Sequence, residues 1–300
     1  MSQSLAAAAL KPDRAPLTAA LVCYVFWGAL PILFNWTGHA GAGAFEIVAW
    51  RTIWSLPCAF GLVMLAGQGP HLMALRARHF AGLTLSAALI AINWTTYVWA
   101  VNSGHTLSAS LGYYLNPLLN MAAGAVLFRE RIDRAGLIAI ALAGMGVVLQ
   151  GLALGSFPWV SLVVALSFGG YGIIRKKIAV EAQTGLLVEC LILFLPAVAY
   201  ALYLAHTGAG VFGVKPTASL LLIACGPATV VPLALFAFAA RRLTLTLIGF
   251  LQFITPTLQF MVGVEAGEAL TPLRMLSFVF IWSGVVVFAL GMWRKRQRQA

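Results

Sequence analysis

The chain has 300 residues, of which 61% are hydrophobic and 9% are charged, and its mean hydropathy is +0.93. This composition excludes a water-soluble protein with one buried core, because too few polar side chains remain to cover such a core. The formal net charge is +11. The basic residues responsible for it lie mostly in alternate gaps between the apolar runs described below, so no nucleic-acid partner is needed to explain the charge.

Ten apolar runs follow one another along the chain, and each is long enough to cross a hydrocarbon layer of about 30 Å as a helix. They begin near Thr18, Ala44, Phe80, Thr106, Ala135, Phe157, Thr184, Thr217, Leu243 and Arg274. The runs are continuously apolar rather than alternating, which favours helices over a β-barrel. The sequence therefore predicts an all-α integral membrane protein with ten transmembrane helices.

Most of the 19 lysines and arginines lie in alternate gaps between these runs. The pair Arg76 and Arg78 and the triplet at 175–177 mark one side, whereas Lys215 and Arg274 lie on the other. Because basic residues in short loops stay in the cytoplasm, this alternation predicts that both termini are cytoplasmic.

The two halves of the chain carry similar motifs in the same order. Asn116-Pro117 is followed by Glu130 in the first half, and Thr255-Pro256 is followed by Glu268 in the second. Each half has an odd number of spans, five, so the second repeat begins on the opposite side of the membrane and is inverted relative to the first. Inverted repeats are an architecture typical of transporters. We therefore predict a cytoplasmic N-terminal segment (1–17), two inverted five-helix repeats (18–152 and 153–293) and a basic cytoplasmic tail (294–300).

Pro117 and Pro256 fall within apolar runs, where each is predicted to break its helix, free a carbonyl and serve gating. Free carbonyls at membrane depth are tolerated around a cavity, and polar and aromatic residues cluster near them. The predicted substrate-binding residues are Trp27, Arg51, Asn93, Trp94, Tyr97, Tyr113, Asn116 and Gln252. The alternative is ordinary packing and hydrogen bonding between helices.

Three charged side chains fall inside spans, and a charge within the membrane predicts a function. Arg51 is predicted to bind a substrate carboxylate; the alternatives are a buried pair with Glu46 or Glu189, or snorkelling to the headgroups. Glu189 and Glu46 are the candidates for proton coupling, although Glu189 can equally pair with Lys176 or Lys177. Glu46 and Arg51 are five residues apart, so we expect each to have another partner.

Several strings resemble the RarD-type members of the EamA group in the drug/metabolite transporter superfamily. They include Phe26-Trp27-Gly28, Asn93-Trp94, Ala109-Ser110-Leu111-Gly112-Tyr113 and RKKIAVEAQTG at 175–185. The resemblance spans the whole chain. It implies a ten-helix permease of the bacterial inner membrane, built from two inverted repeats, that acts as an exporter.

We therefore predict a secondary active transporter that exports small amphipathic metabolites or drugs by alternating access, driven by proton influx. No phosphate-binding loop or CxxC spacing is present in the sequence, so we expect no cofactor and no metal. The histidines lie at or beyond the span ends and show no HExxH or paired-carboxylate spacing, so we expect no enzymatic activity. The expected partners are the solute, protons and the lipid bilayer. The alternatives are an uncoupled facilitator or channel, and a polytopic enzyme that modifies lipids.

A homodimer is a further option, because Ser277, Gly284 and Gly291 recur every seven residues on the last span. Such a stripe of small residues serves close helix packing. The sequence leaves open whether the partner helix belongs to the same chain or to a second copy.

Overall fold

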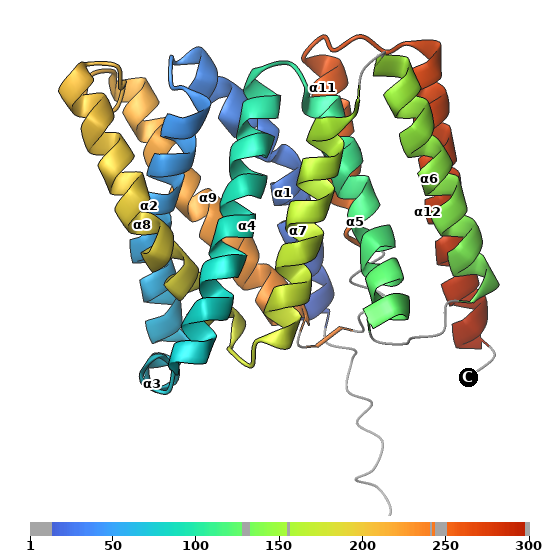
Figure 1. The fold of residues 1–300 in the computed structure, drawn as a ribbon, viewed down its shortest axis with the longest axis horizontal. Helices are drawn as coiled ribbons and strands as arrows, with labels where there is room; N and C mark the ends of the chain where they lie inside the picture. The colour runs from blue at the N-terminus through green and yellow to red at the C-terminus, as the bar shows by residue number, and fades with distance from the viewer. Residues whose placement is uncertain (1–13, 128–132, 155–156, 241, 244–250, 298–300) are drawn as a thin grey trace, which may run out of the picture.

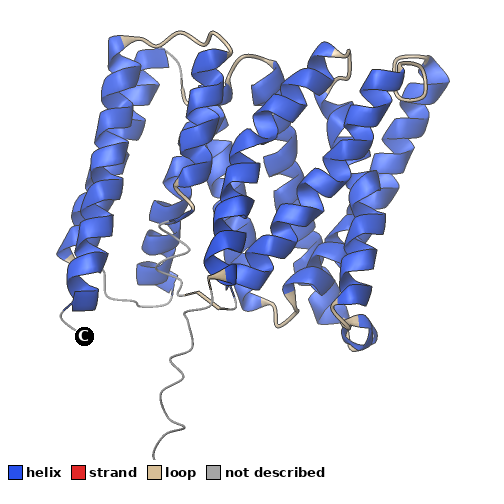
Figure 2. Ribbon diagram, turned by 180° about the vertical axis from the view of Figure 1, so that it is seen from behind, coloured by secondary structure: helices blue, strands red, loops and turns tan. Residues whose placement is uncertain are grey.

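The computed structural model describes residues 14–127, 133–154, 157–240, 242–243 and 251–297, and the regular structure of these residues is helical. The helices of the first half are α1 (Ala15–His39), α2 (Ala44–Leu65), α3 (Gly69–Met73), α4 (Ala77–Asn102), α5 (Thr106–Leu127) and α6 (Arg134–Leu154). Those of the second half are α7 (Trp159–Lys177), α8 (Ala182–Thr207), α9 (Pro216–Ala240), α11 (Ile254–Glu265) and α12 (Pro272–Gln297). The long helices run side by side through the molecule (Figure 1), and the view from behind shows the same arrangement (Figure 2).

Seven of the described helices are long and apolar enough to cross a membrane: α1, α2, α4, α6, α8, α9 and α12. Their 18-residue windows have mean hydropathies between 1.3 and 2.2. A shorter apolar stretch, Trp159–Arg175, forms most of α7. These helices confirm the predicted class, an all-α multi-pass membrane protein, and the number of ten spans stays a prediction.

Helices from the two halves pack against each other throughout the molecule. In the first half, α1 packs on α9 and α11, and α2 packs on α8 and α9. From the second half, α7 packs on α4 and α5. The core is therefore built between the halves, as in the cluster that joins Phe34 and Tyr97 to Leu222 and Cys225.

The stripe of small residues on α12 packs on α6 of the same chain. A Cβ placed on Gly284 would lie 3.0 Å from the carbonyl oxygen of Ala139, and one on Gly291 would lie 2.4 Å from the Cβ of Ala135. Ser277 on the same stripe is buried. The stripe thus lets two helices of one chain approach closely, and a homodimer stays a prediction.

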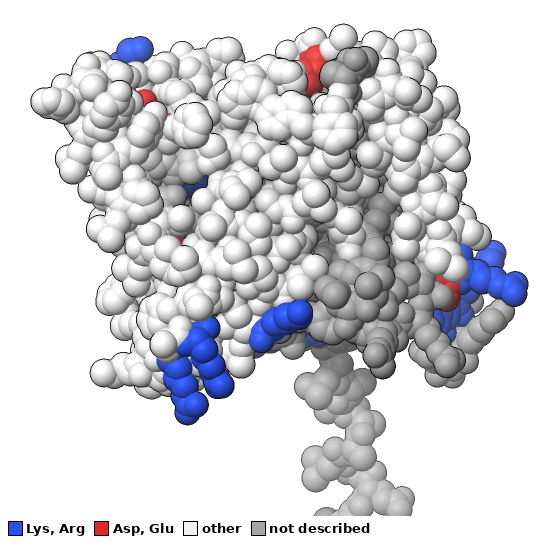
Figure 3. All heavy atoms as spheres, viewed as in Figure 1, with Lys and Arg blue, Asp and Glu red and all other residues white. Residues whose placement is uncertain are grey.

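Basic side chains gather along one end of the helix bundle, the lower edge in Figure 3, where the C-terminal helix also ends (Figure 1). The surface between the two ends is almost free of charge in this view. This separation agrees with the alternation of basic and neutral gaps in the sequence.

Candidate functional site

Arg51 lies on α2 with its guanidinium turned into the protein, and 5% of its surface is exposed. Its Nε donates a hydrogen bond of 2.6 Å to the hydroxyl oxygen of Thr229 on α9. The Thr229 hydroxyl donates in turn to the carbonyl of Cys225, so its oxygen is free to accept from Arg51. The contact joins α2 to α9 through two residues that are 178 positions apart in sequence.

Aromatic rings cover the guanidinium. Its Cζ lies 4.1 Å from the ring centroid of Trp94 and 5.4 Å from that of Phe34. A cation over an aromatic face gains about 0.5 to 2 kcal/mol, more where water is excluded. The rings therefore stabilise the buried charge in part, although they carry no negative charge to neutralise it.

The aromatic wall continues away from Arg51. The Phe34 and Tyr97 rings meet edge to face at 6.0 Å, and the Tyr97 and Tyr113 rings do so at 5.3 Å. The Tyr113 hydroxyl donates a 2.9 Å hydrogen bond to the side-chain oxygen of Asn93. Contacts thus bring together five predicted site residues in one continuous group: Arg51, Trp94, Tyr97, Tyr113 and Asn93.

Asn93 is fully engaged between helices. Its amide nitrogen donates to the carbonyl of Val164 at 3.0 Å and to the hydroxyl of Ser167 at 3.2 Å, both on α7. Together with the bond from Tyr113, these contacts tie α4 to α5 and α7. The side chain of Asn93 therefore serves hydrogen bonding between helices, the alternative to solute binding that the sequence leaves open.

Two predicted site residues have buried polar atoms without a hydrogen-bond partner among the described residues. They are Tyr97, through its hydroxyl, and Asn116, through both amide atoms. A buried polar group without a partner costs roughly 1 to 3 kcal/mol. Such groups are accordingly candidates for contact with a solute.

The remaining predicted solute contacts lie apart from the guanidinium. Trp27 packs against Tyr24 and Phe236, and its carbonyl accepts a 3.3 Å hydrogen bond from Gln259. It also borders the cluster that contains Tyr97. Gln252 lies half-buried in a turn just before α11.

Pro256 lies in the first turn of α11, which begins at Ile254. A proline there removes no helical hydrogen bond, because the first N–H groups of a helix have no partner within it. Its carbonyl accepts a 3.0 Å hydrogen bond from Ser110 of α5. Pro256 thus follows a turn at Gln252 and Phe253, and the predicted helix breaks stay predictions, because residues 244–250 and the side chain of Pro117 lie outside the described residues.

Glu189 is buried on α8, where it accepts hydrogen bonds from two side chains and forms an ion pair with a third, all on α4 and α7. Ser86 donates to it at 2.6 Å, Tyr171 donates at 3.2 Å, and the Nε of Arg175 lies 3.5 Å from its Oε1. Among the described side chains its cationic partner is thus Arg175 rather than Lys177, and the side chain of Lys176 lies outside the described residues. Arg175 also donates to two backbone carbonyls at the start of α8, contacts that suit a guanidinium with several N–H groups.

Gly185 provides the space for the Arg175 side chain. A Cβ placed on Gly185 would lie 1.9 Å from a terminal nitrogen of Arg175. In the sequence Arg175 belongs to a basic triplet that predicts orientation, so its inward position could not be read from the pattern.

The Glu46 carboxylate accepts hydrogen bonds from the backbone N–H groups of Val211 and Phe212, at 2.9 and 3.2 Å. These residues lie in the connection between α8 and α9. Glu46 and Arg51 therefore each have another partner, as their spacing predicts.

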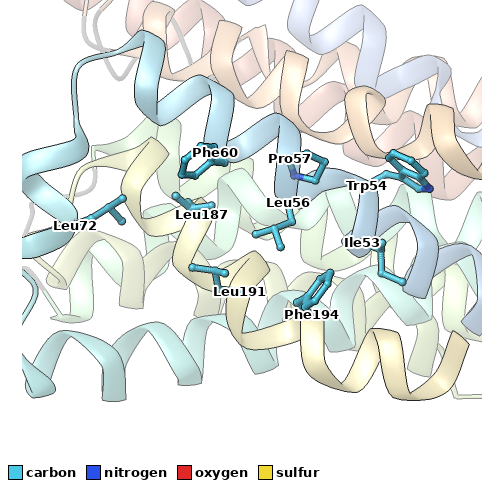
Figure 4. A pocket seen from close by; sticks show the side chains of 9 residues that line it. All are labelled: Ile53, Trp54, Leu56, Pro57, Phe60, Leu72, Leu187, Leu191 and Phe194. Atoms are coloured by element: carbon cyan, nitrogen blue, oxygen red, sulfur yellow. The ribbon is translucent and has the colours of Figure 1, made fainter. Parts of the chain in front are cut away.

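An apolar groove of about 610 Å³ lies between α2 and α8 (Figure 4). It is lined by Ile53, Trp54, Leu56, Pro57, Phe60, Leu72, Leu187, Leu191 and Phe194. Binding of a small amphipathic solute requires placed polar groups, which this lining scarcely offers. The group around Arg51 is therefore the candidate functional site.

The EamA-like transporter family matches residues 15–152. A Pseudomonas aeruginosa protein named as an uncharacterized transporter is 43% identical over 286 residues, which cover 93% of this chain and 94% of that protein. Protein RarD of Escherichia coli is 40% identical over 284 residues, covering 93% and 95%. The chain belongs to the RarD-type permeases of the EamA-like family.

A further relative is less similar than these two. One from Pseudomonas aeruginosa, named chloramphenicol-sensitive protein RarD, is 34% identical over 262 residues, covering 85% of this chain and 87% of that protein. A solved crystal structure of another protein aligns with a TM-score of 0.61 at 18% identity and covers 93% of this chain and 98% of that one. The last similarity concerns the fold alone.

Several residues of this RarD-type site escape sequence reasoning. Phe34 and Thr229 sit in apolar runs and carry no signal that separates them from packing residues. Ser86 and Tyr171 likewise become visible as partners of Glu189 only once α4, α7 and α8 are assembled.

Proposed function

We propose that this RarD-type chain is a secondary active transporter that exports small amphipathic metabolites or drugs by alternating access. The observation that carries the proposal is the burial of two charged side chains between helices of the two halves. Arg51 of α2 contacts Thr229 of α9, and Glu189 of α8 contacts Ser86 of α4. Charges at membrane depth are expensive and mark pathways for solutes and protons.

We further propose that the chain forms ten transmembrane helices in two inverted repeats, 18–152 and 153–293, with both termini in the cytoplasm of a bacterium. The helix contacts support this. If α7, α8, α9, α11 and α12 correspond to α1, α2, α4, α5 and α6, the contacts of α1 with α9 and α11 mirror those of α7 with α4 and α5. The pairs α2 with α8 and α6 with α12 map onto themselves.

In this proposal the solute binds between the repeats, near the midplane, as in other inverted-repeat transporters. Arg51, Trp94 and Tyr97 contact it directly, and Trp27, Asn116 and Gln252 line its path. Tyr113 and Asn93 hold the wall in place through their hydrogen bond and the bonds of Asn93 to α7. Pro117 and Pro256 mark the helix breaks that allow gating.

Glu189 is the proposed proton carrier. In the state described, its charge is balanced by Arg175 and by hydroxyl donors from Ser86 and Tyr171. Protonation would neutralise Glu189 and release Arg175. The binding of one proton would thereby weaken the contact between α7 and α8. Glu46 is the second candidate for proton coupling. On protonation its carboxylate would have to give up the hydrogen bonds from the backbone N–H groups in the connection between α8 and α9.

Reconstitution into liposomes tests the function. Solutes are first chosen by comparing metabolites inside and outside cells with and without overexpression. A coupled exporter concentrates such a solute when a pH gradient is imposed, whereas a facilitator only equilibrates it. The Glu189→Gln variant is expected to lose concentration against a gradient, and undiminished accumulation by this variant would remove Glu189 from the coupling.

A further inference from the structure

Arg51 is a buried cation without a counterion among the described residues. The ion pair found in the described part of the chain joins Arg175 to Glu189. Glu46 on the same helix is occupied by two backbone N–H groups at the α8–α9 connection. A single positive charge inside a membrane protein needs an anion nearby, and this anion is missing from the described residues.

The guanidinium is prepared for a planar anion. The Nε of Arg51 donates to Thr229, while the two terminal nitrogens of Arg51 donate to none of the described residues. A carboxylate binds a guanidinium through two parallel N–H···O bonds, which is the geometry that a pair of free terminal nitrogens provides. Thr229 fixes the orientation of the fork by holding its third nitrogen.

The surroundings define the rest of the ligand. The Trp94 and Phe34 rings lie beside the guanidinium, and the Tyr97 ring continues from Phe34. Tyr97 is 97% buried, since its exposed fraction is 3%, and its hydroxyl has no partner among the described residues. The hydroxyl can donate to an anion, and the rings offer flat apolar surface to an aromatic or aliphatic body.

We propose that Arg51, Trp94 and Tyr97 form a binding site for the carboxylate of a monoanionic amphipathic solute with an apolar body. The site has this role as part of the transport function proposed above. One carboxylate neutralises one guanidinium, whereas a dianion would leave a net negative charge in the protein interior. A cationic amphiphile would be repelled, because the site already holds an unbalanced positive charge.

Three matched probes test the charge preference in the purified protein: 4-phenylbutyrate, its amide 4-phenylbutyramide and the cation 4-phenylbutylamine. Binding is measured by calorimetry without any gradient, so the result does not depend on transport. Phenylbutyrate is expected to bind at least about tenfold more tightly than the amide, a difference of about 1.4 kcal/mol. The amine is expected not to compete with it.

Variants assign the preference to Arg51. In Arg51→Gln the acid and the amide should bind alike, and Arg51→Lys should keep part of the preference because it keeps the charge but not the planar fork. Arg76→Gln, which removes an exposed arginine just before α4 begins, should behave as the wild type. Since the three probes are first compared on the wild type, a variant that fails to fold does not remove the test.

The proposal is overturned if the wild type binds acid and amide equally, if it binds neither at millimolar concentration, or if Arg51→Gln retains the preference. These outcomes are separate from failure of the transport function. A protein that prefers the acid through Arg51 but moves no solute in liposomes contradicts transport alone. Transport of an anionic solute that Arg51→Gln leaves unchanged contradicts the carboxylate site alone.

Discussion

Glu268 joins the two halves at one end of the molecule. It lies in the loop between α11 and α12, and its two carboxylate oxygens accept hydrogen bonds from the backbone N–H groups of Thr106 and Leu107, where α5 begins. The start of a helix carries positive partial charge, so the site favours the ionised carboxylate. Burial acts against this and is the larger effect, so the pKa of Glu268 is raised above its ordinary value.

A raised pKa gives Glu268 a defined influence on stability. The folded protein binds a proton at this site more readily than the unfolded chain does, so the contribution to stability is fully present below the unfolded pKa. It is lost as the pH rises through the raised folded pKa. The melting temperature of the wild type minus that of Glu268→Gln should therefore fall as the pH rises above about 4, the ordinary pKa of a glutamate. Thermal unfolding in detergent across this pH range measures the difference.

Glu265→Gln is the matched control, because Glu265 is exposed at the end of α11, three residues before Glu268. Its difference from the wild type should vary less with pH. A difference for Glu268→Gln that stays constant, or that grows as the pH rises, would contradict the role assigned to burial.

At the scale of single residues, the sequence predicts charges better than it predicts their partners. Arg51 and Glu189 stand out because charged residues are rare within apolar runs. Their partners Thr229 and Ser86 do not stand out, since hydroxyl residues are common in membrane helices, where they bond their own backbone or neighbouring helices. Partner choice depends on contacts between distant helices, and periodicity along one helix carries no information about them.

At the scale of helices, close approach depends on small residues at particular positions. Gly226 of α9 lies against the backbone of Trp54 on α2, and a Cβ there would be 2.4 Å from the Trp54 carbonyl carbon and 2.6 Å from its oxygen. A backbone cannot move aside as the end of a flexible side chain can. The contact also holds α2 and α9 at the separation that the bond between Arg51 and Thr229 requires.

Gly226→Ala should therefore push α2 and α9 apart and destabilise the protein by about 1 to 3 kcal/mol, the usual cost of an overpacked core. Gly61→Ala is the control on α2, since a Cβ there meets nothing within 4 Å. It should be neutral or slightly stabilising, because alanine loses less backbone entropy than glycine in a helix. Thermal unfolding of the two variants checks this, and equal melting temperatures would contradict the close contact.

Helix positions follow from the sequence more closely than helix breaks do. The apolar run predicted near Ala44 is helix Ala44–Leu65, and the run near Thr106 is helix Thr106–Leu127. Pro256 is predicted to break its helix, and α11 begins two residues before it, after a turn at Gln252 and Phe253, while residues 244–250 lie outside the described residues. A proline is accepted both at a kink and in a first turn, so its presence alone does not distinguish the two.

At the scale of the whole molecule, composition and charge establish a multi-pass membrane protein, and the order of motifs suggests two repeats. The proposed solute site is different in kind, because it forms where α2, α4 and α9 meet and depends on a contact between residues 178 apart in sequence. Counting spans therefore predicts the framework of this permease, whereas the proposed site becomes visible only once the aromatic and charged side chains are assembled.

The ten-span arrangement makes a prediction for α5 and α7, neither of which is among the seven helices that qualify as spans by length and composition. If both cross the membrane, cysteines at the exposed positions Ser103 and Phe157 face outward, and cysteines at Arg134 and Lys177 face the cytoplasm. In intact cells an impermeant maleimide should label the first two, and the other two only after lysis. The variants are made without the native cysteines, of which Cys58 is half-buried and the other three are buried. Labelling of Ser103→Cys and Arg134→Cys from the same side would show that α5 does not cross, and would exclude the inverted five-helix repeat.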